Sequence, residues 1–353
     1  MRTNLDLHAG EWVLVRSKEE ILQTLDKNGQ MDGLPFMPEM FKLCGQRFRV
    51  YKRAHKTCDP PNGMGGRRML HAVHLEDVRC DGEAHGECQA RCLIFWKEAW
   101  LKRTDADARP EPEFTTLDGC TEQDVLAATR AQTDQADSGE PVFVCQSTRM
   151  AQATIPWRWW DLRQYLEDYT SGNVRISEML AAFLTFVCEQ VASAGLGFGS
   201  GVRWVYNTIQ RIHGGTPYPY RFGEVPPGIK TPSAKLDVRP GDLVKVRSHE
   251  EILATLDGRG LNRGMSFDAE MVPYCGGTYR VLDRVNKIIN EKTGKMQHLK
   301  NDCIMLEKVV CLACYSKYRR FCPRSIYPYW REIWLQRVDG DSSDSLEMSS
   351  SSR

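Results

Sequence analysis

The stretch Gly241–Asp257, GDLVKVRSHEEILATLD, closely repeats the stretch Gly10–Asp26, GEWVLVRSKEEILQTLD. The two align without gaps at an offset of 231 residues, and identical pairs continue as far as Val50 and Val281. Chance does not produce a match of this length. The chain of 353 residues therefore contains two copies of one module, one near each end.

Each copy carries the local signals of a small β-rich module. The segments WVLV and LVKV follow a period of two, which predicts a short strand. Ser17 and Ser248 come next, each with a glutamate three positions later (Glu20 and Glu251), and this is the capping box that begins a helix. We expect the first of these helices to end at Gly29. The segments RFRVYKR and TYRVLDR predict a later strand, and this order of elements favours a small, SH3-like β-barrel.

The two copies also end alike. WKEAWLKR at Trp96 matches WREIWLQR at Trp330, now at an offset of 234 residues. Aromatic and β-branched neighbours favour a strand here, and we expect the tryptophans to pack in the core rather than stack on a ligand. The change of offset means that the second copy has three additional residues. These residues fall among cysteines.

Thirteen cysteines are many for a chain whose N-terminus lacks the apolar run of a signal peptide. In such a chain, clustered cysteines indicate metal binding more than disulfides. The two offsets pair Cys80 with Cys311 and Cys88 with Cys322, so two cysteines persist while the loop between them changes. Thiolates gathered by loops between strands favour tetrahedral zinc. Neither copy shows the regular cysteine run of an iron–sulfur protein.

The sequence therefore predicts one zinc ion in each module, and two in the chain. We expect the first ion on Cys80, Cys88 and Cys92, with Cys58 or His74 as the fourth ligand. The ligands expected for the second ion are all cysteines, namely Cys303, Cys311, Cys314 and Cys322. Four thiolates would close the second site, whereas the histidines near the first leave room there for an open, catalytic position. Those histidines are His71, His74 and His85. Free buried thiols and an iron–sulfur cluster are the alternatives to zinc.

Residues 105–238 repeat neither copy, and they separate the β-rich modules 8–104 and 239–339. We expect them to form a linker and a mostly helical middle segment. Within it, ISEMLAAFLTFVCEQVASAGLGFG is interrupted by two glutamates, which favours a buried amphipathic helix over a membrane span. The polar tail 340–353 has the composition of a disordered segment.

The middle segment also contains an aromatic and basic motif, PWRWWDLRQYLEDY. Trp157, Arg158, Trp159 and Arg163 form a pattern that can stack on nucleic-acid bases. Packing of a helix onto the neighbouring modules is the interpretation that we prefer. The overall charge agrees, because 47 basic and 46 acidic residues leave a net charge of +1 and no global attraction to nucleic acid.

The phrases VRSKEEILQTLD, GLPFMPEM and FWKEAWLKR resemble those of uncharacterised bacterial proteins that have the same two-copy layout. The resemblance covers both terminal modules. It implies a bacterial origin and no activity, fold or site residue.

Together these features predict an α+β protein in which two SH3-like modules with zinc-binding loops flank a mostly helical segment. The chain lacks a nucleophile elbow, a zinc-protease motif and a dinucleotide-binding fingerprint. We therefore expect a cytoplasmic, zinc-stabilised tandem-repeat protein that acts as a binding protein or scaffold for an unknown ligand. A metalloenzyme of a bacterial biosynthetic pathway, with an open zinc site in the first repeat, is one alternative, and a nucleic-acid-binding protein is the other.

Overall fold

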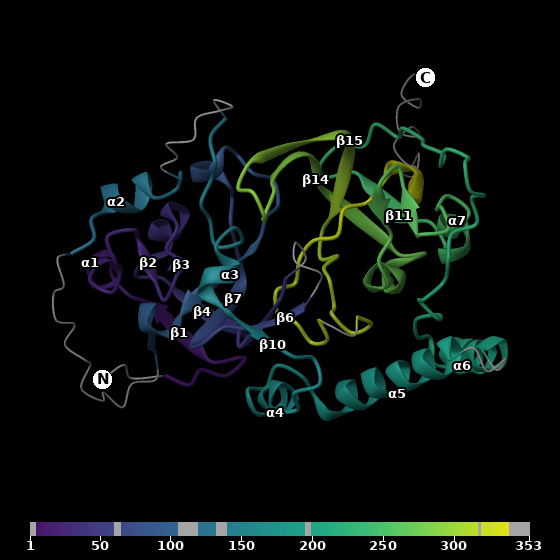
Figure 1. Ribbon diagram of the computed structural model, residues 1–353, viewed down its shortest axis with the longest axis horizontal. Coiled ribbons are helices and arrows are strands. Elements are labelled where there is room, and N and C mark those ends of the chain that lie inside the picture. Colours follow the sequence, from purple (N-terminus) through teal and green to yellow (C-terminus); the bar gives the residue numbers. More distant parts are fainter. Residues whose placement is uncertain are drawn as a thin grey trace, which may run out of the picture.

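Two antiparallel sheets, one from each copy of the repeated sequence, lie side by side above a layer of helices (Figure 1). The computed structural model describes residues 5–59, 65–104, 119–131, 140–194, 199–316 and 319–338. The predicted tail 340–353 and most of the predicted linker that follows residue 104 lie outside these residues. The α+β class is confirmed.

The sheet of the first copy has five antiparallel strands in the order β8-β7-β4-β1-β9. They are β1 (Trp12–Val15), β4 (Arg47–Arg53), β7 (Ala72–Arg79), β8 (Leu93–Lys97) and β9 (Leu101–Arg103). The sheet of the second copy has the order β15-β14-β11-β16. Its strands are β11 (Leu243–Val246), β14 (Thr278–Ile289), β15 (Met296–Leu306) and β16 (Leu335–Arg337). Among the described residues the two edge strands of each sheet do not pair with each other, so hydrogen bonds between them do not close a barrel.

The central strands have matching partners in the two copies. Val13 of β1 lies opposite Phe48 and Arg103, and Val244 of β11 lies opposite Tyr279 and Arg337. These partners are the residues that the two sequence offsets relate. The shared sequence therefore produces the same strand pairings in the same register.

The loops match as well, although their sequences have diverged. Left-handed backbone is uncommon outside glycine. Here non-glycine residues adopt it at equivalent positions of both copies: Asp32 and Arg263 (φ 52° and 47°), Asp77 and Lys308 (57° and 60°), Glu87 and Phe321 (58° and 58°), Arg91 and Ser325 (48° and 42°). The last two pairs lie in the cysteine loops. Equivalence of the copies thus extends through the region where the three residues are inserted.

Both predicted capping boxes are present, at the start of α1 (Lys18–Leu22) and α7 (His249–Leu253). The prediction that the first helix ends at Gly29 is wrong, because α1 ends seven residues earlier. Just beyond its end, the Thr24 hydroxyl bonds the carbonyl of Ile21 and accepts a hydrogen bond from Trp100 Nε1 at 3.0 Å. Thr255 and Trp334 repeat this contact at 2.9 Å. In each copy a buried tryptophan therefore holds the threonine that follows the helix, at the point where the helix has ended.

The repeated tryptophans are core residues, as predicted. Trp96, Trp100, Trp330 and Trp334 are fully buried. The strand predicted for this segment holds only in part, since β8 ends at Lys97 and a 3-10 turn, η4 (Glu98–Trp100), separates it from β9. In the second copy η6 (Glu332–Trp334) takes the same place before β16.

The middle segment contains helices, but they cover less than half of its described residues. Its helices are α2 (Glu122–Ala127), α3 (Met150–Ala153), α4 (Arg163–Thr170), α5 (Ile176–Ser193) and α6 (Gly199–His213). It also supplies β10 (Ile155–Trp157), which extends the hairpin of β5 (Lys56–Asp59) and β6 (Gly65–Arg68) in the first copy. The remaining elements are short: β2 (Gln30–Met31), β3 (Leu34–Pro35), η1 (Pro38–Leu43), η3 (Glu83–His85), β12 (Leu261–Asn262), β13 (Met265–Ser266) and η5 (Ala269–Tyr274).

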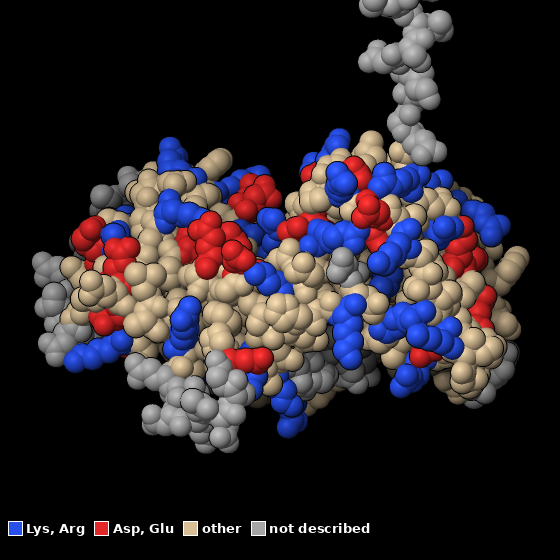
Figure 2. Space-filling view, turned by 90° about the horizontal axis from the view of Figure 1, so that it is seen from above, with Lys and Arg blue, Asp and Glu red and all other residues tan. Residues whose placement is uncertain are grey.

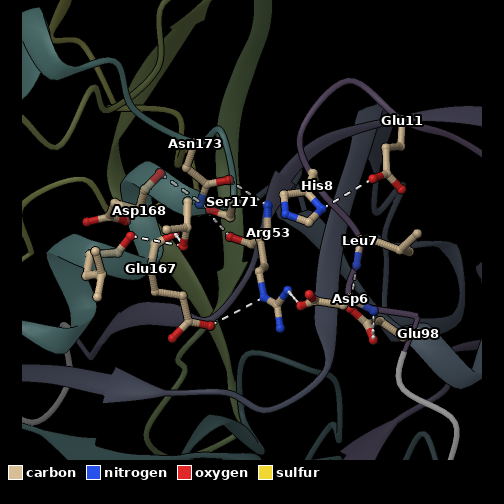
Figure 3. Close-up of polar contacts among 12 residues, drawn as sticks. Asp6, Leu7, His8, Glu11, Arg53, Glu98, Glu167, Asp168, Ser171 and Asn173 are labelled. Atoms are coloured by element: carbon tan, nitrogen blue, oxygen red, sulfur yellow. Dashed lines mark hydrogen bonds and ion pairs between the residues drawn. The ribbon is translucent and has the colours of Figure 1, made fainter.

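Polar contacts hold α4 against the first copy. Figure 3 shows Arg53 between Asp6 and Glu167, and its Nε lies 3.3 Å from a Glu167 oxygen. The backbone N–H of Arg53 donates to Asn173 Oδ1 at 2.8 Å. Deeper inside, Lys56 of β5 pairs with Asp168 of α4, and both side chains are buried. The first repeat therefore positions the helical layer.

Candidate metal centres

One group of potential ligands meets closely among the described residues. The ligand atoms of Glu39, Cys80 and His85 all lie within 4.8 Å of one another. Glu39 comes from η1, Cys80 follows β7 and His85 ends η3. Glu39 Oε1 accepts a hydrogen bond from the Cys80 thiol at 3.4 Å and lies 2.7 Å from His85 Nδ1. The structure therefore contains a carboxylate, a thiol and an imidazole that can hold a metal ion.

The second ring nitrogen of His85 is also engaged. Its Nε2 lies 3.0 Å from the carbonyl oxygen of Val144. The two ring nitrogens of His85 therefore lie against two oxygens, one of Glu39 and one of Val144. These contacts fix the orientation of the ring beside Cys80.

Four cysteines line a small cavity next to this group, with a volume of about 40 Å³. They are Cys80, Cys88, Cys92 and Cys145. Three of them are the cysteines predicted for the first site. The structure does not bring either predicted fourth ligand, Cys58 or His74, to this cavity, and it places Cys145 of the middle segment there instead.

Buried hydrogen bonds fix the segment that carries Cys145. The Gln146 side chain accepts from the N–H of Phe95 at 2.8 Å and donates to the carbonyl of Phe95 at 2.9 Å. Ser147 donates to Cys92 Sγ at 3.5 Å, and the N–H of Cys145 donates to the Thr148 hydroxyl at 2.9 Å. The segment thus joins the edge of β8 beside Cys92. No spacing rule relates Cys145 to the repeated cysteines, which is why the sequence prediction missed it.

A second cluster gathers Cys58, Cys311 and Cys322 around Ala313. Cys58 and Cys322 are buried, and all three cysteines line a cavity of about 330 Å³. The N–H of Cys314 donates to Glu270 Oε2 at 3.0 Å, and its Sγ lies 3.5 Å from the carbonyl oxygen of Leu312, so Cys314 is not among the residues that line this cavity. Only two of the four cysteines predicted for the second site, Cys311 and Cys322, are therefore within it.

Cys303, the remaining predicted ligand, packs elsewhere. It lies in β15, and its Sγ is 3.9 Å from Met265 Sδ and 3.6 Å from an Arg331 nitrogen. It belongs to an apolar group with Val285 and Met305. The structure therefore separates Cys303 from Cys311 and Cys322.

The two clusters are built on the same loop framework. Cys80 donates its N–H to the carbonyl of Cys92 at 2.9 Å, and Cys311 does the same to Ile326 at 2.7 Å. Glu270 stands where Glu39 stands in the first copy. Glu39 contacts the ring of His85. Glu270 instead accepts hydrogen bonds from three backbone N–H groups, those of Cys314, Tyr315 and Ser316. Each loop thus places a buried carboxylate near its first cysteine.

Each cluster also receives a residue from the other copy. Cys58 of the first copy lies with Cys311 and Cys322 of the second. At the equivalent position of the second copy, Ile289 donates its N–H to Cys88 Sγ at 3.3 Å. The clusters are therefore points of contact between the repeats.

Burial controls the ionisation of most of these thiols. It raises the pKa of Cys80, Cys88 and Cys311, and it raises that of Cys145 to about 12. A hydrogen bond between Cys58 and Cys322 raises the pKa of Cys58 well above its ordinary value and lowers that of Cys322 to about 7. Because zinc binds thiolates, metal binding here must displace protons.

A buried arginine lies between the two clusters. Arg324 is 2% exposed, pairs with Glu291 and donates to the Ser147 hydroxyl at 2.9 Å. Burial alone would lower its pKa, but Glu291, Cys58 and Cys92 raise it. The same Ser147 hydroxyl donates to Cys92 Sγ in the first cluster, and Arg324 lines the cavity of the second cluster. Its positive charge therefore faces thiols of both clusters.

The other predicted histidine ligands lie away from the cysteines. His74 is fully buried in β7, its Nδ1 is 2.9 Å from the carbonyl of Ile94, and burial lowers its pKa to about 3. Its ring packs on Phe95 with centroids 4.4 Å apart. His71 is in a turn with φ 51°. Of the three histidines considered for an open site, only His85 lines the cavity of the first cluster.

The aromatic and basic motif is partly occupied by internal contacts. Trp157 is buried, donates to Asp161 at 2.9 Å and stacks under Arg68. Arg163 pairs with Asp161 at 2.6 Å. Trp160 is 56% exposed, with the Arg158 guanidinium 5.2 Å from its ring. The surface open to a nucleic acid is narrower than the sequence suggests.

The fold and these centres define an α+β protein with repeated antiparallel sheets and two groups of buried or partly buried cysteines. Comparisons with protein-family models, with curated proteins and with solved structures each found no match to this chain.

Proposed function

We propose that the protein is a zinc-stabilised tandem-repeat binding or scaffold protein. The observation that carries the proposal is that cysteines from separate segments line two cavities at the contact between the repeats. In the first, zinc would take Cys80, Cys88, Cys92 and Cys145. In the second it would take Cys58, Cys311 and Cys322, and the fourth ligand that we propose is Cys314, three positions after Cys311. Four thiolates make a closed, structural zinc site.

The charges around the clusters support this assignment. A zinc ion with four thiolates carries a net negative charge, and a buried cation nearby stabilises it. Arg324 faces both clusters, and Arg319 lines the second cavity, where Cys311 and Asp268 raise its pKa despite burial. Each arginine already has a carboxylate partner, Glu291 for Arg324 and Asp268 for Arg319. Thiolates nearby would add to that attraction.

A metalloenzyme is the second candidate, and the Glu39–His85 pair favours it. A carboxylate and an imidazole beside Cys80 could serve as acid and base if a metal in the first cluster kept an open position. This would require one of the four cysteines lining that cavity not to bind. A nucleic-acid-binding function has less support, because Trp157 is buried and Arg163 is paired.

Elemental analysis combined with X-ray absorption of the purified full chain tests the proposal. We expect close to two zinc ions per chain and sulfur-only ligand shells. Cys145→Ser and Cys58→Ser should each remove one ion. Cys120→Ser is the matched control, since Cys120 is buried but lines neither cluster cavity, and it should keep both ions. A folded protein without metal would overturn the proposal, and a light oxygen ligand in the first cluster would favour the enzyme.

A further inference from the structure

The helical layer exposes an unusual amount of apolar surface. More than half of the exposed large apolar side chains in the described residues lie between Trp160 and Ile212. The predicted burial of the long helix is therefore wrong, because only 11% of α5 is buried. Soluble proteins seldom leave so large an apolar area open unless it binds something.

The exposed side chains follow the period of each helix. On α5 they recur at helical spacing, at Ile176, Leu180, Phe183, Leu184, Val187 and Val191. On α6, Val205, Ile209 and Ile212 do the same, and Trp204 is 69% exposed. Leu162, Leu166 and Tyr169 repeat the spacing on α4. We call these residues of α4, α5 and α6 the apolar helical face.

The opposite side of the layer is already occupied by the protein. Phe321, from the loop with the three inserted residues, packs on Val174 and Ala182. Arg320 lies 5.1 Å from the ring of Phe186, and the Tyr220 hydroxyl donates to the carbonyl of Tyr315. The second repeat therefore holds the inner side of the helices. The outer side has no partner among the described residues.

A groove opens between α5 and α6 where they meet the second repeat. It has a volume of about 810 Å³, and Leu184, Val205 and Ile209 of the apolar helical face are among its lining residues. The buried side chains of Thr185 and Tyr206, together with Tyr315 of the second repeat, complete a mostly apolar lining. Such a groove accepts flexible hydrocarbon chains.

The charged residues around the apolar helical face indicate what kind of partner it binds. The exposed charged residues between residues 158 and 213 are Arg158, Arg163, Arg175, Glu178, Arg203 and Arg211. The acidic residues there are less exposed: Glu167 and Asp168 contact Arg53 and Lys56, Glu189 is half-buried, and Asp161 pairs with Arg163. By contrast, Lys/Arg and Asp/Glu are interspersed on the side of the molecule that Figure 2 shows from above. An apolar face rimmed by arginine, with exposed Trp160, Tyr169 and Trp204, is the pattern of a helix that lies in a membrane interface.

We infer that the apolar helical face binds the surface of a membrane that contains anionic lipid, with α5 and α6 lying in the plane of the interface. α5 is the one described helix long and apolar enough to cross a membrane. Its packing against Phe321 keeps it parallel to the protein body, so the bound state is peripheral. The inference rests on the proposed binding function and names its partner, but it does not depend on the zinc ions.

Co-sedimentation of the full chain with vesicles tests this inference. We compare vesicles of phosphatidylcholine alone with vesicles that also contain phosphatidylserine. Binding should require phosphatidylserine and weaken as salt increases. The double variant Leu180→Glu/Leu184→Glu should abolish binding, and Arg203→Glu/Arg211→Glu should weaken it at least about tenfold, since each basic residue near an anionic surface contributes about 1 kcal/mol.

The controls are Leu126→Glu, an exposed leucine on α2, and Arg259→Glu, an exposed arginine in a turn of the second repeat. Both should bind vesicles like the parent chain. Failure of the parent chain to bind anionic vesicles, while it retains two zinc ions, would overturn the membrane inference and leave the zinc proposal standing. A dimer in analytical ultracentrifugation that Leu184→Glu dissociates, without vesicle binding, would assign the face to a second copy instead. Loss of zinc with intact vesicle binding would overturn only the metal proposal.

Discussion

Cys58 and Cys322 share a hydrogen bond in a buried cluster, although one belongs to the first repeat and the other to the second. Their contact joins the hairpin of β5 and β6 to the loop that carries the inserted residues. That loop also packs against α5 through Phe321. The pair therefore lies where both repeats and the helical layer meet.

Removing Cys58 tests this junction. Cys58→Ser should reduce the zinc content from two ions to one and lower the midpoint of thermal unfolding, because structural zinc binding is coupled to folding. Cys303→Ser should leave the zinc content unchanged, since Cys303 contacts Met265 but does not itself line the cavity of the cluster. Metal analysis and calorimetry measure the two effects. The reverse result, with zinc lost from the Cys303 variant only, would restore the ligand set predicted from the sequence.

The fourth ligand of the first cluster can be tested in the same way. Cys145→Ser should remove the ion bound by Cys80, Cys88 and Cys92. His74→Leu should retain it, because the His74 ring is held by Ile94 and Phe95 in the sheet. Cobalt substitution provides the readout, since thiolate-to-cobalt absorption counts sulfur ligands. Loss of the ion from the His74 variant, with a folded chain, would show that His74 binds metal.

His74 should also make stability depend on pH. Its pKa is about 3 in the folded protein, against 6.5 for an ordinary histidine, because burial disfavours the charged ring. The unfolded chain therefore takes up the proton first, so stability is complete above pH 6.5 and falls as the pH drops toward 3. The slope from this residue is about 1.4 kcal/mol per pH unit.

Denaturant titrations at several pH values measure that slope. His74→Leu should flatten it, whatever its effect on stability at neutral pH. An equal slope in the parent chain and the His74 variant would contradict the prediction.

The buried pair of Lys56 and Asp168 should be costly to break. Asp168→Asn leaves the Lys56 ammonium without its counter-ion in a site where both side chains are buried. Removing one partner of a buried pair typically costs about 3–5 kcal/mol. We expect a loss of that size in the free energy of unfolding, and α4 should become the first helix exposed to proteolysis.

Asp161→Asn is the matched control for this change. Asp161 pairs with Arg163, whose side chain is 78% exposed. Such surface pairs contribute at most about 1 kcal/mol. Comparable losses in the two variants would show that Lys56 finds another partner.

Local pattern was enough to predict much of the fold. The two repeats, their capping boxes and the buried tryptophans follow from period, spacing and residue type, which act over a few neighbouring positions. The pairing of Cys80 with Cys311 and Cys88 with Cys322 also came from alignment of the copies, and the structure gives both loops the same backbone contacts. The end of α1 was missed, because a tertiary contact from Trp100 holds Thr24 there.

By itself, then, the sequence determined the duplication, the elements of each repeat and the residue types available for metal binding. Only the tertiary structure decided which cysteines share a cluster, since Cys145 and Cys58 arrive from other parts of the chain and obey no local spacing. It also decided that α5 is exposed. A helical period shows that a helix has an apolar face, but whether that face is covered depends on how wide a surface the rest of the protein presents. Here the loop around Phe321 covers only a narrow stripe, at Ala182.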